Sequence, residues 1–420
     1  MSKAWSLSAD LRGFYDDNYL TLPKSLRQST WGTEISPSVA VNHSVQDTLF
    51  SASYVYDLRW YATHPTPGSS TDQSHQFNAR FEHEFSDRYK LSLNESFVIA
   101  QEPTVIDPTV ISSPLRVNGN NIRNTGQADF TAELTKLLDL HLGYANTVYA
   151  YQQTADSVVG YPFSPITGYS AFPGQAGTPF EPSRSASLDR MEQLVTLDLR
   201  WKATPDTTGV FGYQYGHVDY TSPEYIIYPD KDAGEVGYLS NIRNDDEHFG
   251  FIGIDESFTP DLNASIRVGA EYIDYYNFHT SKLSPYVDAN LTWQYTAQSS
   301  AQVGVKHLHN TTDVTGYSTP VLDTDTTAVY ASVSHNITDR VTINAMGQAQ
   351  YSTFNGGDEA AVGSIDGESE DFYVAGVNLA YHFNPWFLTE AGYDYSKLNS
   401  EVAGRSYTRN QVYVGIRGTY

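Results

Sequence analysis

The sequence contains no cysteine, which excludes disulfide bonds, thiolate metal sites and a cysteine nucleophile. Basic residues are also scarce: 25 Lys and Arg stand against 49 Asp and Glu, and the formal net charge is −24. Because nucleic acid is bound by a basic face, this charge excludes it as an expected partner. No apolar run approaches the roughly 18 residues that a transmembrane helix needs.

The first residues, MSKAWSLSADLRG, contain no apolar core of a secretory signal peptide. The lack of cysteine is nevertheless typical of a chain that passes through an oxidising compartment. We therefore expect a mature, exported chain from which the signal has been removed and to which a methionine has been added.

Tyrosine is abundant, with 32 residues, and aromatic side chains make up 14% of the sequence. In segments such as 48–60 (TLFSASYVYDLRW), 76–85, 190–202 and 262–272, apolar and polar residues alternate. Strict alternation predicts strands with one apolar and one polar face. We count roughly eighteen such segments, an even number, as in single-chain outer-membrane barrels.

A short turn recurs between these segments. It is written FSDRYKLSL (85–93), FTPDLNASI (258–266), ITDRVTINA (337–345) and FNPWFLTEA (383–391), with a looser copy, ATPDTTGVF, at 203–211. The other connections are long and rich in Gly, Pro, Asn and Asp: 16–32, 102–125, 153–189, 221–245 and 354–371. Short periplasmic turns and long extracellular loops are the layout of an outer-membrane barrel.

The expected fold is therefore all-β: one domain over 1–420, a closed antiparallel transmembrane barrel of about eighteen strands. A β-propeller is the alternative, because the turn recurs at intervals that four-stranded blades would also give. A propeller buries both faces of its middle strands, whereas one face here is polar throughout, so the barrel is favoured. In lipid the apolar face points outward and the polar face lines the lumen.

Aromatic residues beside the short turns predict an interfacial girdle at one membrane surface. Its expected members are Phe85, Tyr89, Trp201, Phe258, Trp293, Phe383 and Trp386. The last segment, QVYVGIRGTY, ends on an aromatic residue, as the C-terminal assembly signal of outer-membrane barrels does. Tyr413, Gly415 and Tyr420 match that pattern, while Gly418 replaces an expected apolar residue.

The stretches ADLRGFYDDNYLTLP near the start and RSYTRNQVYVGIRGTY at the end resemble the Putative beta-barrel porin 2 family of Gram-negative outer membranes. The resemblance lies in these motifs and in the barrel layout of the whole chain. It implies a porin-like barrel; functions within the family are diverse, and some members are tied to exopolysaccharide export. It carries over no catalytic residues.

Charged residues on the polar face are the expected pore lining, where opposed charges would flank a water-filled channel. They are Arg12, Arg59, Arg80, Glu82, Glu84, Arg190, Glu192, Asp198, Arg200, Lys202, Arg267 and Glu271. The alternative is that they form salt bridges between neighbouring strands. Since both signs are nearly balanced, we expect at most a mild cation preference. The apolar loop 153–189 is expected either to fold inward and narrow the barrel or to form an outer rim for a partner.

No metal site or other cofactor is expected. His307 and His309 share a strand face, but the sequence places no third ligand near them. The acidic loop 354–371 lacks the spacing of a twelve-residue calcium loop, so a solvated loop is expected. A hydrolase in the barrel wall is disfavoured, because no nucleophile motif is present.

We therefore expect a non-enzymatic channel of the bacterial outer membrane for passive diffusion of small hydrophilic solutes. Exopolysaccharide export and a structural or adhesive barrel that binds a partner through its loops are the alternatives. The expected partners are outer-membrane lipid, lipopolysaccharide and the barrel assembly machinery; further subunits or a polysaccharide are open alternatives.

Overall fold

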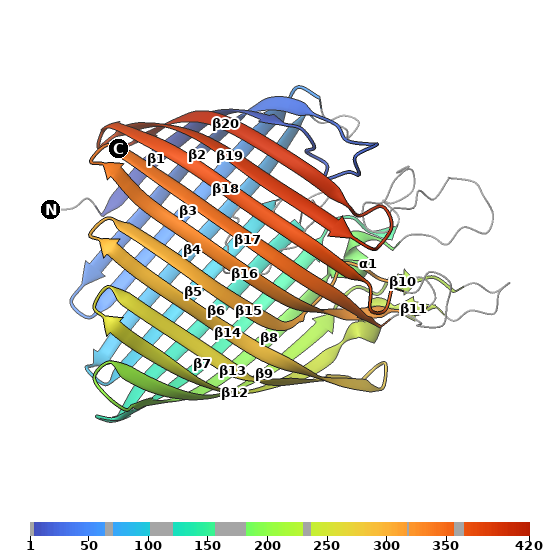
Figure 1. Cartoon of the computed structure of the whole chain (residues 1–420), viewed down its shortest axis with the longest axis horizontal. Helices are drawn as coiled ribbons and strands as arrows, with labels where there is room; N and C mark the ends of the chain where they lie inside the picture. The colour runs from blue at the N-terminus through green and yellow to red at the C-terminus, as the bar shows by residue number, and fades with distance from the viewer. Residues whose placement is uncertain are drawn as a thin grey trace.

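A computed structural model of the chain describes residues 4–63, 70–100, 121–155, 182–229, 237–316, 319–356 and 365–420. Its main feature is an 18-stranded antiparallel sheet that closes on itself, because β1 pairs with both β2 and β20 (Figure 1). This confirms the predicted barrel. Within the described residues no helix is long and apolar enough to cross a membrane.

The barrel strands follow one another around the wall in chain order. They are β1 (Trp5–Asp16), β2 (Thr30–Val45), β3 (Thr48–Tyr61), β4 (Thr71–Ser86), β5 (Tyr89–Ala100), β6 (Asn121–Thr135), β7 (Leu138–Tyr151), β8 (Arg190–Lys202), β9 (Thr207–Tyr220), β12 (Asp245–Thr259), β13 (Leu262–Tyr275), β14 (Thr280–Thr296), β15 (Ser299–Asn310), β16 (Val321–Thr338), β17 (Val341–Gly356), β18 (Ser369–Asn384), β19 (Phe387–Ser400) and β20 (Tyr407–Thr419).

The two ends of the chain close the barrel. Register pairs run from Ser8↔Thr419 to Asp16↔Gln411, and Leu7 and Tyr420 exchange two backbone hydrogen bonds of 3.1 and 2.8 Å. The Trp5 and Tyr420 rings lie beside each other, with centroids 5.7 Å apart. Closure leaves no free sheet edge, which satisfies the backbone groups of every strand inside a membrane.

Four of the short turns are two-residue connections that share two local features. Facing residues at the turns are Ser86↔Tyr89, Thr135↔Leu138, Thr338↔Val341 and Asn384↔Phe387. In each, the first side chain accepts a hydrogen bond from the N–H two residues on, at 2.9–3.3 Å. Such Ser, Thr and Asn turns reverse the chain through local contacts alone.

The second feature is a bulge directly before these four turns and before the turn at 260–261. The ladder skips Phe85, Leu134, Ile337 and Phe383, and also Phe258 before the turn at 260–261, and all five side chains are exposed. A bulge turns an extra residue out of the ladder. The apolar residue that opens each repeat is therefore placed on the outer surface.

The long connections gather at the opposite end of the barrel (Figure 1). Residues 17–29 agree with the predicted loop, whereas β6 begins at Asn121, so the connection predicted as 102–125 ends earlier. The 221–245 connection contains the small hairpin β10 (Tyr225–Ile227) and β11 (Tyr238–Leu239) and the 3-10 turn η2 (Ser240–Arg243). The end of the 153–189 connection forms the short helix α1 (Arg184–Leu188).

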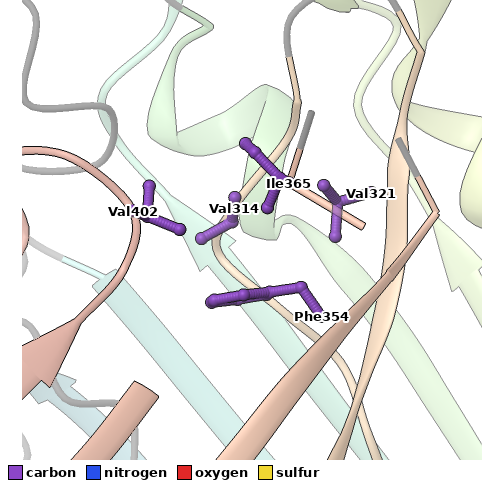
Figure 2. Close-up of a cluster of buried hydrophobic side chains, with 5 residues drawn as sticks. All are labelled: Val314, Val321, Phe354, Ile365 and Val402. Carbon is purple, nitrogen blue, oxygen red and sulfur yellow. The ribbon is translucent and has the colours of Figure 1, made fainter. Parts of the chain in front are cut away.

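Apolar packing lies at the loop end. One buried cluster joins Val314, Val321, Phe354, Ile365 and Val402, which come from three connections and from the ends of β16 and β17 (Figure 2). Others join Ala186 to Ile226 and Ile227, and Phe14 to Tyr19 and Tyr61. The connections are thus packed against one another by their own apolar side chains.

The β15–β16 hairpin departs from the wall at this end. Pairing of β14 with β15 stops at Val287↔His307, although β15 continues to Asn310. Leu322 of β16 packs on Ile273 and Tyr275 of β13, which alternate with the exposed, outward Tyr272. The loop end of β15 and β16 therefore folds inward across the inner face of β13. No sequence pattern indicated this inward fold.

Candidate functional site: the barrel interior

The predicted pore-lining charges lie on the inward-facing positions of β1, β3, β4, β8 and β13. Outward neighbours on the same strands are exposed apolar residues, such as Leu11, Trp60 and Val195. What the sequence did not reveal is which charges meet.

The wall formed by β1, β2, β3 and β19 carries a connected ion-pair group. Arg12 contacts Glu390 at 2.6 Å and Glu34 at 3.4 Å, while Arg59 contacts the other oxygen of Glu34 at 2.5 Å. Glu34 and Glu390 were not predicted, although their strands alternate as clearly as the others. The group borders a cavity of about 370 Å³. A polar, ion-paired wall of this kind suits a water-filled lumen.

At the short-turn end, charges also pair along one wall. Arg80 Nε donates to Glu82 at 2.9 Å, and Lys90 lies 3.6 Å from Glu82 and 3.5 Å from Glu84. Arg80 borders a second cavity of about 450 Å³. Lys202 contacts Asp139 at 2.9 Å.

Four charges of β8 pair with residues of their own wall: Arg190, Glu192, Asp198 and Lys202. Arg190 contacts Glu192 at 2.7 Å and lies over the Tyr149 ring, 4.0 Å from its centroid. Asp198 lies 3.4 Å from His141 on β7. Arg267 makes the same kind of contact, a two-oxygen pair with Asp255 at 2.8 and 2.9 Å. These contacts agree with the alternative of salt bridges between neighbouring positions.

Glu271 departs from the expected lumen exposure. Its side chain is fully buried, because the inward-folded end of β15 covers it and the His309 backbone N–H donates to it at 3.3 Å. A solute in an open lumen does not reach this carboxylate. The expectation that Glu271 lines the pore is wrong for this physical reason.

A group of buried charges, Arg405 with Asp313 and Glu370, crosses the loop end and is called the Arg405 latch below. Arg405, between β19 and β20, donates two hydrogen bonds to Asp313, of 3.1 and 3.0 Å, and a third to Glu370 at 3.3 Å. Arg243 donates to the backbone oxygens of Thr312 and Ser187. These contacts tie the inward-folded hairpin to η2, α1 and the β19–β20 connection. Glu370 is thus enclosed, and the expectation of a wholly solvated acidic loop fails at this residue.

The end of the 153–189 connection is buried from Ser183 to Leu188. Ser183 caps α1 by accepting a hydrogen bond from the Ala186 N–H at 2.9 Å, and Ser240 donates to the Ala186 oxygen at 2.7 Å. All residues of α1 are buried. Residues 156–181, which carry most of the apolar side chains behind the predicted narrowing, lie outside the described residues.

The latch predicts a response to acid. Burial acts to raise the pKa of Asp313, but the charge and hydrogen bonds of Arg405 outweigh it, and the pKa is lowered. A carboxyl with a lowered pKa stabilises the fold above its ordinary pKa of about 4, and the stabilisation is lost as pH falls through the lowered value. We expect loop 311–316 to become cleavable by an acid-active protease at about pH 3 but not near pH 5. Asp313→Asn should abolish this pH dependence; an unchanged response in that variant would contradict the assignment.

The seven expected girdle residues, including Phe85, Phe258 and Trp386, are all exposed on the outer surface, at or beside the short turns. At the C-terminal segment, Tyr413 points inward and receives a hydrogen bond from Asn378 at 3.0 Å, with Arg12 over its ring. A Cβ at Gly415 would lie 2.6 Å from the Arg12 side chain, so this position has room for glycine alone.

Residues 253–420 match the protein family described as Putative beta-barrel porin 2. The resemblance inferred from the sequence is confirmed over this part of the chain. No curated protein matches. The closed barrel and the family match indicate a protein of the bacterial outer membrane, in contact with membrane lipid.

Two solved structures have a similar course of the chain. OccAB4 of Acinetobacter baumannii has 11% identity and a TM-score of 0.46, covering 100% of this chain and 99% of that chain. A BenF-like porin from Pseudomonas fluorescens has 9% identity and a TM-score of 0.44, with the same coverage. At such identities and scores these likenesses carry no argument about function.

Proposed function

We propose that this barrel, a part of which matches a porin family, is a channel for passive diffusion of small hydrophilic solutes across the outer membrane. The observation that carries the proposal is the wall itself: a closed 18-stranded sheet surrounds charged and polar side chains instead of an apolar core. Barrels of 16–18 strands are wide enough to enclose an aqueous channel.

Weak charge selectivity follows from the pairing of the lumen charges. Arg12 and Arg59 are matched by Glu34 and Glu390, so the β1–β3 side presents little net charge. The β12–β16 side carries more carboxylates than bases. Because the described strands present no continuous ladder of Lys and Arg to the lumen, we propose a mild cation preference and no specific anion site.

Conductance of the purified protein in planar lipid bilayers tests the proposal. We expect stable single-channel currents in KCl and a small reversal potential of the sign that cation preference gives. A folded barrel that inserts without current would overturn the channel and favour the structural or adhesive alternative. Exopolysaccharide export is the less favoured transport role, because a polymer needs a wide passage and the contacts of Arg405 with Asp313 and Glu370 cross the loop end.

Removing the charges of Arg12 and Arg59 from the ion-pair group should increase selectivity for cations. In Arg12→Gln/Arg59→Gln, the carboxylates of Glu34 and Glu390 lose their charged partners and face water. We expect the cation-to-anion permeability ratio to rise about two- to fivefold, since charged rings set the local ion concentration. Arg27→Gln is the control, because Arg27 pairs with Asp17 on an exposed loop. Equal ratios in the double variant and the control would contradict a lumen role for this group.

We also propose roles for residues at the membrane boundary. The exposed aromatic residues at the short turns would lie at the periplasmic lipid interface. Tyr413, Gly415 and Tyr420 would form the segment that the barrel assembly machinery binds, and lipopolysaccharide would surround the loop end. Binding of further subunits or of a polysaccharide by the loops is a separate proposal. We propose no enzymatic activity and assign no catalytic residue.

A further inference from the structure

One histidine behind the inward-folded hairpin is surrounded by carboxylates from other strands. His309, near the end of β15, lies 3.5 Å from Glu247 of β12 through Nε2 and 3.5 Å from Asp323 of β16 through Nδ1. Its backbone N–H donates to Glu271 of β13 at 3.3 Å. Asp245 lies two positions from Glu247 on the same face of β12. Potential ligand atoms of Asp245, Glu247 and His309 all lie within 4.8 Å of one another.

The negative charge of this group is only partly matched by bases. Lys282 contacts Asp323 at 3.2 Å and Asp325 at 2.7 Å, and the Tyr275 hydroxyl donates to Asp323. Asp323 therefore has its own partners. Within the described part of the chain, no Lys or Arg forms an ion pair with Asp245, Glu247 or Glu271. Among the residues that the structure describes, His309 is their one basic neighbour.

Several polar atoms of the group have no hydrogen-bond partner among the described residues. They are Asp245 Oδ1, Glu271 Oε1 and both ring nitrogens of His309. These residues are buried, with exposures of 2%, 0% and 5%. Buried polar atoms are nearly always satisfied, and an unmatched buried charge is costly. Their convergence points to a positively charged ligand.

We propose that Asp245, Glu247 and His309 bind a divalent transition-metal ion of the Zn²⁺ class, with Glu271 or water completing the coordination. Two carboxylates and one imidazole are a ligand set that Zn²⁺ accepts. The imidazole nitrogen disfavours Ca²⁺ and Mg²⁺, which take oxygen ligands. The ion would satisfy the unmatched oxygens and a ring nitrogen together.

The sequence showed no further ligand near His307 and His309. In the fold, the carboxylates of Asp245 and Glu247 reach His309 from a strand 62 or more positions earlier in the chain. His307 is not part of the group, because its ring contacts Thr327 at 2.7 Å. The ion would join β15 of the inward-folded hairpin to β12 of the wall. If the barrel conducts as proposed above, the metal would fix the position of the segment that narrows it.

Metal binding can be measured without reference to transport. Purified protein in detergent micelles, stripped with a chelator, is titrated with Zn²⁺ by calorimetry, and bound zinc is counted by elemental analysis after gel filtration. We expect one tight equivalent per chain and an increase in thermal stability. Calcium at the same concentration should produce neither effect.

Variants separate this group from other surface ligands. Glu247→Gln and His309→Ala should each weaken Zn²⁺ binding by at least about tenfold. His307→Ala and Asp246→Asn are matched controls, because they lie beside the ligands in sequence and outside the group, and should bind like the native protein. The heat-dependent shift in gel mobility shows whether each variant is folded. If His309→Ala does not fold, Glu247→Gln, which keeps the shape of the side chain, carries the test.

Two results would overturn the site. One is the absence of stoichiometric zinc in the folded native protein, which would leave protonated His309 as the counter-charge. The other is equal zinc affinity in Glu247→Gln and the native protein. A silent barrel that still binds zinc through this group would refute the channel and leave the metal site standing.

Discussion

Arg405→Ala should release the inward-folded hairpin and increase single-channel conductance. Arg405 is fully buried and holds Asp313 and Glu370 through three hydrogen bonds. Its removal leaves two buried carboxylates without the base that pairs with both of them. Breaking a buried ion pair in this way costs about 3–5 kcal/mol. We expect this loss of stability to open the loop end locally and not to unfold the barrel, because the backbone hydrogen bonds between the neighbouring strands are retained.

Planar-bilayer recordings and limited proteolysis measure the effect together. The variant should show larger or noisier currents and faster cleavage within 311–316. Arg88→Ala is the matched control, since Arg88 lies at a short turn at the opposite end and contacts the backbone oxygens of Glu133 and Leu134. If Arg405→Ala conducts and resists protease like the control, the latch does not hold the hairpin.

Val268→Arg should destabilise the barrel strongly. Val268 lies midway along β13 and is exposed on the outer, apolar face. If that face contacts the hydrocarbon core, an arginine near the bilayer centre costs about 2–4 kcal/mol. The backbone ladder is unaffected by the change, so the loss reports on the environment of the side chain.

Equilibrium unfolding in lipid vesicles with a chemical denaturant gives the free energy of unfolding. Ser265→Arg is the control, because Ser265 is on the inner face of the same strand, opposite Asp255. We expect it to change unfolding little and to shift ion selectivity. Equal destabilisation by both substitutions would contradict the assignment of the two faces of β13.

The barrel wall was predictable because its determinants are local. Alternation along segments such as 48–60 defines the two faces of a strand wherever the strand lies. The recurring turns contain their own hydrogen bonds, for example Asn384 to the Trp386 N–H at 2.9 Å. The bulge that turns Phe85 outward was not foreseen, because bulges depend on how two strands are aligned.

The partners of the lumen charges were not predictable for a related reason. Glu34 meets Arg12 and Arg59 only because β2 lies between β1 and β3 in one particular register. Loop 153–189 was expected either to narrow the barrel or to form an outer rim, and most of it lies outside the described residues. Among the described residues, the connection 311–316 at the inward-folded end of β15 and β16 is held by Arg405, a residue 92 positions away from Asp313.

By itself, the sequence determined an all-β barrel with apolar outer and polar inner faces, short turns at one end and long connections at the other. The alternation of apolar and polar residues and the hydrogen bonds of the turns involve residues close in the chain, so both can be recognised in the sequence. Tertiary structure alone decided that the loop end of β15 and β16 folds inward, that Arg405 binds Asp313 and Glu370, and that His309 lies beside Asp245 and Glu247. These are contacts between distant segments, set by strand register and loop packing, which no local pattern encodes.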